Sequence, residues 1–299
     1  MKRLFTSVWV VVCLAASASA TTKTFVPSSG IWNDVNNWSP SGLPTVNDNV
    51  VIPGGKVCNV DITTATAQTM EVYGTLNIQP GKKLTLDLYT SNVPLDSIVD
   101  GIVTLVHDNT GFGTLTFAQG THTVTGDGRI AGQEVTCTIE VGSSSILTNE
   151  LAGSGEGIRE SLTIRGLTAS GQTNGTFVNQ GLVEAVGHLT LHADTILDDD
   201  GTGLWKAVSC KTVLQFDRQA LGLDGDFQLG CGSKFLFNAS IKTCGTLIYN
   251  STGIDVENSA TFQYAAFSGS QANPGSATPP VTCNNPWTVS ADDCCCVCL

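Results

Sequence analysis

The chain of 299 residues carries 26 acidic and 14 basic residues, which gives a net charge of −12. With so few cations it cannot neutralise many phosphates, which argues against nucleic acid and anionic membrane surfaces as partners and counts against polyanionic sugars. The length allows one or two domains, or one elongated array of repeats.

Residues 1–20 have the pattern of a secretory signal peptide. Lys2 and Arg3 precede an apolar stretch, residues 8–16, and the small residues "ASASA" follow up to Ala20. The apolar stretch is shorter than the roughly 20 residues that a helix needs to span a bilayer. We expect cleavage after Ala20, a mature chain without a transmembrane segment, and a secreted or cell-surface location.

Short strands dominate the chain from residue 21 onward. Residues 47–78, "NDNVVIPGGKVCNVDITTATAQTMEVYGTLNI", are rich in β-branched residues broken by glycine and threonine, and "LTLDL", "TCTIEV", "HLTLH" and "VLQF" repeat the period of two further along. This period is that of strands, and glycine-, asparagine- and aspartate-rich turns separate them. We expect Trp32 and Trp38, which come first, to plug the open apolar end of the first coil.

One short pattern recurs at the start of predicted strands. It occurs at Gly74-Thr75-Leu76, Gly113-Thr114-Leu115 and Gly245-Thr246-Leu247, with a variant at Gly175-Thr176-Phe177. The intervals of 39, 62 and 70 residues are close to multiples of about 20, the size of one solenoid coil. The sequence therefore predicts an all-β fold, a right-handed parallel β-helix (β-solenoid), with capping coils in residues 21–90 and further coils in 91–267. A β-sandwich is the alternative.

Two segments resemble known extracellular families. Residues 29–87, in which a Trp and a Pro precede the "DNVVIP" strand, a glycine turn and a "GTL" strand, resemble the eight-glycine domain of secreted and cell-surface proteins. Residues 175–205, with "F-x-N-x-G" and "L-x-L" motifs, are similar to the β-helix repeats of autotransporter and filamentous-haemagglutinin-like adhesins. Both resemblances imply an extracellular parallel β-helix, and neither implies a particular reaction.

Catalytic chemistry on a β-helix would need carboxylates or basic residues that converge on one groove. Arg159 and Arg165 offer the basic residues of a polysaccharide lyase, but their spacing also fits an ordinary exposed strand face. His188 and His192 lie on one strand face, because their spacing is even, and make at most half of a metal site. We therefore expect no metal and no cofactor.

Residues 198–205 hold the candidate binding residues. Asp198, Asp199 and Asp200 form the densest acidic cluster, in a "LDDDGTG" segment that has the composition of a solvated turn. Trp205 follows, and at a coil edge its ring would stack on a sugar.

Cysteines are the last feature. Cleavage of the signal removes Cys13 and leaves ten of the 11, an even number that favours disulfides in an oxidising compartment. Cys210 and Cys231 are 21 residues apart and would stack on adjacent coils about 4.8 Å apart, which suits a disulfide; Cys231 with Cys244 is the competing pair. The linker and cysteine-rich tail, residues 268–299, ends in "DDCCCVCL" and is expected to form disulfides within itself or to another chain.

These features favour a secreted or cell-surface β-solenoid that acts as a structural, adhesive or ligand-presenting module. Its expected partner is a polysaccharide or a cell-surface or matrix ligand. The alternative is a carbohydrate-active enzyme, a polysaccharide lyase or hydrolase of the parallel β-helix type.

Overall fold

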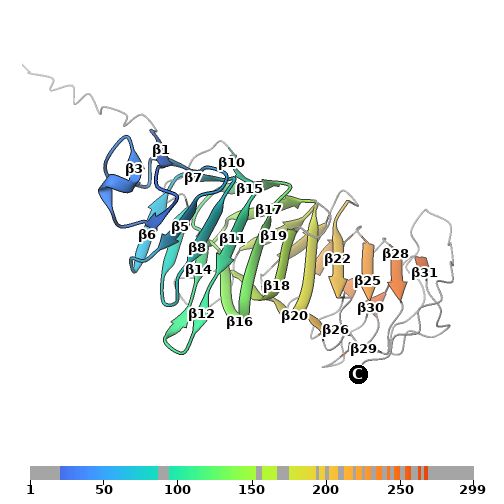
Figure 1. Cartoon of the computed structure of the whole chain (residues 1–299). Coiled ribbons are helices and arrows are strands. Elements are labelled where there is room, and N and C mark those ends of the chain that lie inside the picture. The colour runs from blue at the N-terminus through green and yellow to red at the C-terminus, as the bar shows by residue number, and fades with distance from the viewer. Residues whose placement is uncertain are drawn as a thin grey trace, which may run out of the picture.

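The strands wind into a parallel β-solenoid whose coils stack along one axis (Figure 1). The computed structural model describes residues 21–86, 94–152, 157–166 and 175–192, and from residue 195 to 268 chiefly the strands themselves. Strands of successive coils pair in parallel, and the antiparallel pairs among the described strands are β1–β3 and β12–β13. This pairing confirms the predicted parallel β-helix and rules out the antiparallel sandwich.

The first face of the solenoid is a 10-stranded sheet. Its strands are β1 (Thr22–Phe25), β3 (Trp38–Ser39), β4 (Asn49–Ile52), β7 (Thr69–Val72), β10 (Leu95–Val99), β15 (Thr121–Gly126), β17 (Ile146–Leu151), β19 (Thr176–Asn179), β21 (Thr195–Asp198) and β24 (Ala220–Leu223). Two shorter strands, β27 (Ile241–Lys242) and β30 (Phe262–Gln263), pair in parallel with each other.

The second and third faces form one 17-stranded sheet. The second face holds β2 (Ser29–Ile31), β5 (Val57–Val60), β8 (Thr75–Ile78), β11 (Ile102–Leu105), β22 (Leu204–Ala207), β25 (Asp226–Leu229), β28 (Thr246–Tyr249) and β31 (Ala266–Ser268). The third face holds β6 (Thr64–Ala67), β9 (Lys83–Leu86), β14 (Thr114–Phe117), β23 (Val213–Phe216), β26 (Lys234–Phe237) and β29 (Gly253–Val256).

Three long strands turn the corner between the second and third faces and join them. These are β16 (Arg129–Val141), β18 (Gly157–Gly166) and β20 (Leu182–His192). The register shifts between Gln133 and Thr138 in the β16–β18 pair, and between Glu160 and Leu162 in the β18–β20 pair. Bulges of this kind bend a strand, so each long strand serves both faces.

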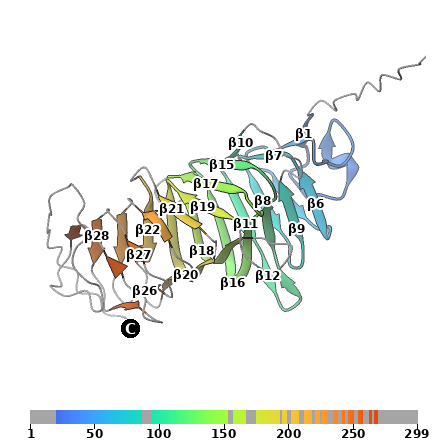
Figure 2. The ribbon, with the colours of Figure 1, turned by 180° about the vertical axis from the view of Figure 1, so that it is seen from behind.

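A small hairpin projects at the same corner, one coil earlier. It consists of β12 (His107–Asp108) and β13 (Gly111–Phe112) and lies beside β16 at the lower edge of the array (Figure 2). The backbone N–H of His107 donates to Oε1 of Gln133 at 3.1 Å, which ties the hairpin to β16.

Alternate residues of each strand point inward, and together they form one continuous apolar core. Each inward residue lies over its copy in the next coil, as Leu76 of β8 lies between Cys58 of β5 and Val103 of β11. Cys58 and Cys137 are buried free thiols within this core. These two thiols therefore take no part in the disulfides that the even cysteine count favours.

Aromatic rings close the N-terminal end of the core, as predicted. Trp32 and Trp38 are buried edge to face with ring centroids 4.9 Å apart, and Phe25 packs against Trp38 at 5.4 Å. The indole N–H of Trp38 donates to the carbonyl of Trp32 at 2.9 Å, so burial leaves this polar group satisfied. A short 3₁₀ helix, η1 (Val35–Asn37), leads into Trp38.

The coils are less uniform than a 20-residue unit predicts. Partners in adjacent coils are 18 residues apart for Val57 and Thr75, and 31 apart for Lys83 and Thr114. The recurring Gly-Thr-Leu pattern opens strands on different faces: β8 and β28 on the second, β14 on the third, and the variant β19 on the first. It marks the start of a strand after a corner and not a coil period.

Several sequence-based predictions fall outside the described residues. These are the signal peptide at 1–20, the boundary between residues 90 and 91, the tail from residue 269, and both cysteines of the predicted bridge.

We predict that Cys210 and Cys231 form a disulfide in the mature protein. Val213 and Lys234, each three residues further along, are register partners 21 residues apart, and the two cysteines have the same separation. Non-reducing peptide mapping should recover the linked peptides, with the buried Cys58 alkylated only after denaturation as an internal control. A Cys231–Cys244 peptide, or free Cys231, would contradict the prediction.

Candidate functional site

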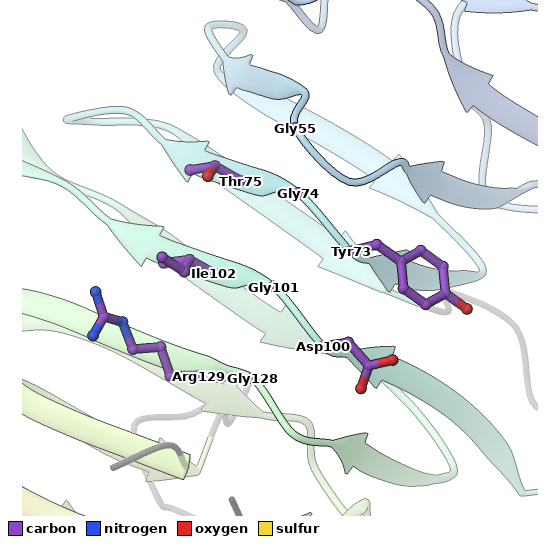
Figure 3. Close-up of a pocket in the computed structure, with 9 residues that line it drawn as sticks. All are labelled: Gly55, Tyr73, Gly74, Thr75, Asp100, Gly101, Ile102, Gly128 and Arg129. Atoms are coloured by element: carbon purple, nitrogen blue, oxygen red, sulfur yellow. The ribbon is translucent and has the colours of Figure 1, made fainter. Parts of the chain in front are cut away.

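A hollow of about 380 Å³ follows the corner between the first and second faces, and we call it the first corner groove (Figure 3). It lies where β4, β7, β10 and β15 of the first face lead into β5, β8, β11 and β16 of the second. Its lining residues are Gly55, Tyr73, Gly74, Thr75, Asp100, Gly101, Ile102, Gly128 and Arg129.

The floor of the groove is bare backbone, because glycines stack there from coil to coil. A Cβ on Gly101 would lie 2.1 Å from the carbonyl oxygen of Gly74, and one on Gly128 would lie 2.2 Å from that of Gly101. Nothing larger than glycine fits so close to the preceding coil. The amides of Gly101 and Gly128 donate to Val72 and Val99 of that preceding coil, each at 2.7 Å.

Two rows of side chains stand on either side of this floor. Tyr73 and Asp100 lie on one side, at the ends of neighbouring first-face strands, and Figure 3 shows both clear of the glycines. Thr75, Ile102 and Arg129 form the other row, because they are register partners at the starts of β8, β11 and β16. The groove thus offers an aromatic ring, a carboxylate, a hydroxyl and a guanidinium.

Hydrogen bonds leave much of this chemistry available. The Tyr73 side chain is 41 % exposed, and its hydroxyl donates to Oε2 of Glu71 at 3.2 Å. The charge of Glu71 raises the pKa of Tyr73, which keeps the phenol protonated. Oδ1 of Asp100 accepts from the amide of Asp127 at 3.0 Å, and the buried Nε of Arg129 has no hydrogen-bond partner.

The candidate binding residues from the sequence lie elsewhere. Trp205 is completely buried, with its ring 5.3 Å from Phe216 and stacked at 6.1 Å on Phe227, so it belongs to the core and exposes no face to a ligand. Asp198 is the last residue of β21, and Asp199 and Asp200 lie outside the described residues. A binding role for the three aspartates stays a prediction.

The two arginines considered for a lyase do not converge on one site. Arg159 of β18 lies on the second face and pairs with Glu184 at 2.9 Å, whereas Arg165 lies on the third face and pairs with Glu140 at 2.6 Å. Both glutamates are buried beneath their partners, so these are ion pairs between coils on the outward side of the strands, and both arginines are paired there.

The histidines on β20 also have partners in the next coil. A ring nitrogen of His188 lies 2.7 Å from Oε1 of Gln215, and Nδ1 of His192 lies 3.3 Å from Oδ2 of Asp217. In the part of the chain that the structure describes, no group of three or more His, Cys, Asp or Glu side chains is placed to hold a metal ion.

Glu140 is a buried carboxylate at the centre of an ion cluster between coils. Its carboxylate accepts from Lys83 at 2.8 Å, from Arg165 at 2.6 Å and from the Thr116 hydroxyl at 2.8 Å, which links β9, β14, β16 and β18. Burial alone would raise the pKa of Glu140, but the bonds from Lys83, Arg165 and Thr116 outweigh it and lower the pKa. The cluster fastens successive coils and the charge of its one carboxylate is fully balanced, so its role is structural.

Sequence reasoning missed the first corner groove, although the sequence carries a signal for it. Gly74, Gly101 and Gly128 recur at an interval of 27 residues, and each follows or precedes a lining side chain. A search for multiples of about 20 passes over this interval.

Comparison with known proteins gives one match. The model of the G8 domain family matches residues 37–131, which include the whole floor of the first corner groove. No model of autotransporter or haemagglutinin repeats matches the chain. No curated protein and no solved structure matches it.

In the described residues, no helix is long and apolar enough to cross a membrane.

We predict that Gly101→Ala lowers the free energy of unfolding by about 1–3 kcal/mol, because the new methyl would overlap backbone that cannot move aside. Urea denaturation would measure the loss. Gly54→Ala is the matched control, since a Cβ there meets only Tyr73 O at an ordinary 3.8 Å, and it should stay within about 0.5 kcal/mol of wild type. Equal effects of the two variants would contradict the close-packed floor.

We also predict that Glu140→Gln costs roughly 1–3 kcal/mol of stability at neutral pH, because two cations lose their buried partner. Since the native pKa of Glu140 is lowered, its contribution is fully present above the ordinary glutamate pKa of 4.5 and is lost as the pH falls through the native pKa. The gap between wild type and variant should therefore close in acid.

Urea denaturation from pH 7 to pH 3 would follow this gap. Glu150→Gln, at an exposed position of β17, is the control and should change stability by less than about 0.5 kcal/mol throughout. A gap that persists unchanged at the lowest pH would show that the Glu140 cluster does not act through its charge.

Proposed function

We propose that the protein is an extracellular β-solenoid module that binds a neutral polysaccharide along the first corner groove and does not cleave it. The observation that carries this proposal is an exposed ring, Tyr73, flanked by Asp100 and Arg129 over a floor without side chains. The signal-like residues 1–20 and the G8 match support an extracellular location.

The mixed chemistry of the groove favours a neutral, polyhydroxylated ligand. Asp100 accepts hydrogen bonds and Arg129 donates them, so sugar hydroxyls can serve both without bringing a net charge. An aromatic side chain with a few placed polar groups is the usual composition of a small-molecule site. The ring of Tyr73 can pack on the apolar face of a sugar while its hydroxyl stays bonded to Glu71.

The geometry of the groove favours an extended ligand over a single sugar. Its lining runs from Gly55 through Gly74 and Gly101 to Gly128, which belong to four successive coils. Three spacings of about 4.8 Å make it roughly 14 Å long. A chain of sugars lying parallel to the solenoid axis therefore touches every coil of the groove.

The groove is less suited to cleavage. Hydrolysis of a glycosidic bond uses a pair of carboxylates about 5–9.5 Å apart. Among the nine residues that line the groove, Asp100 alone carries a carboxylate, and it already accepts a bond from the Asp127 amide. The hydrolase alternative therefore lacks its second acid at this position.

Tyr73→Ala should weaken polysaccharide binding about three- to tenfold, the loss expected when one stacking aromatic contact is removed. Affinity electrophoresis or calorimetry with a panel of neutral and acidic polysaccharides would measure it on the mature protein. Ile146→Ala is the control, because Ile146 is similarly exposed, at 38 %, on the first face away from the groove.

The same panel tests the enzymatic alternative when reducing ends and unsaturated products are recorded alongside binding. Release of products by the wild-type protein would overturn the non-catalytic proposal. If the wild type and Tyr73→Ala bind every polysaccharide with equal affinity, the first corner groove is not the binding site.

A further inference from the structure

A second hollow, of about 480 Å³, lies at the corner between the second and third faces, and we call it the second corner groove. Its lining residues are Thr63, Thr64, Gly81, Lys82, Lys83, Thr110, Gly111, Phe112 and Thr114. The β12–β13 hairpin forms one wall, held in place where the amide of Gly81 donates to the carbonyl of Phe112 at 3.0 Å.

The polar side chains of this groove can all donate hydrogen bonds, and its charged side chains are all positive. Two ammonium groups and four threonine hydroxyls line it together with the 38 % exposed ring of Phe112, and none of the nine residues carries a carboxylate. The nearby carboxylate of Asp108 is turned to its own hairpin, where it accepts from the amide and the hydroxyl of Thr110. The groove is therefore locally positive in a chain whose net charge is −12.

Lys82, like Arg129 of the first corner groove, differs from the other described cations because its side chain has no partner among the described residues. Four of them are committed to carboxylates: Lys83 and Arg165 to Glu140, and Arg159 and Lys206 to Glu184. Lys23 and Lys56 donate to backbone carbonyls. The side chain of Lys82 has no hydrogen bond or ion pair with any residue that the structure describes, although Lys82 is half-buried at the groove.

We propose that the second corner groove binds an oxyanion, a carboxylate or a sulfate, with Lys82 as its main ligand. Lys83 lies next to Lys82, and its ammonium pairs with the Glu140 carboxylate at 2.8 Å. This ion pair holds Lys83 in place, so Lys83 adds positive potential to the groove without serving as the main ligand. Hydroxyls of the lining threonines other than Thr110, which donates to Asp108, donate to the remaining oxygens, and the ring of Phe112 covers the apolar part of a ligand that carries the anion. This proposal is independent of polysaccharide binding at the first corner groove.

Isothermal titration calorimetry at constant ionic strength tests the proposal on the mature protein. The probes are sodium sulfate, and galacturonate with galactose as a pair that differs in its carboxylate. Sulfate and galacturonate should bind to the wild type and galactose should not. Binding of sulfate alone would assign the site to a free inorganic anion, whereas tighter binding of galacturonate would assign it to the anionic group of a sugar.

Lys82→Gln should weaken binding of the anions about tenfold, since it removes one charge-assisted hydrogen bond. Lys56→Gln is the matched control, because it removes the same charge from a lysine outside the groove that bonds to Val26 O. Circular dichroism and the urea midpoint check that both variants fold.

Equal weakening by the two lysine variants, or a wild type that binds galactose as well as galacturonate, would overturn the proposal. Tyr73→Ala separates it from the proposed function, because that variant should bind sulfate as the wild type does. Failure of the polysaccharide experiment thus leaves the oxyanion site standing, and failure here leaves the first corner groove standing.

Discussion

Backbone pairing of each coil with the next, in register, is the constraint on which this molecule depends. It places every inward side chain about 4.8 Å from the side chain at the same position of the neighbouring coil, so apolar side chains stack into columns. Ile52, Val72 and Val99 form one such apolar column. Polar residues can form such a column too, as Asn149 and Asn179 do, with Nδ2 and Oδ1 2.8 Å apart.

The same constraint organises the outer surface. Glu140 lies between Thr116 and Arg165 because the three are register partners on β14, β16 and β18, and its bonds therefore run along the solenoid axis. Such ion pairs between coils place charged groups beside groups of opposite charge. Net charge consequently says little about any one corner, and an acidic chain can still carry a positive groove around Lys82.

The period of two in the sequence was enough to predict the strands, the recurring Gly-Thr-Leu pattern led to the parallel solenoid, and the need to cap such a coil led to the aromatic plug at Trp32 and Trp38. Positions that depend on register were out of reach. Arg165 and Glu140 are 25 residues apart, and nothing local shows that they meet. Trp205 was misjudged for a related reason: it alternates in phase with the buried Ala207, but its strand was read as a coil edge.

The unequal lengths of the coils have a consequence for how such a protein evolves. Adjacent partners are 18 residues apart at Val57 and 31 at Lys83, yet the paired strands remain four residues long, so the difference is confined to the corners. The β12–β13 hairpin is an added corner of this kind, and it forms a wall of the second groove. Insertions at corners can therefore create new surfaces while the core stays as it was, which separates the evolution of recognition from that of stability.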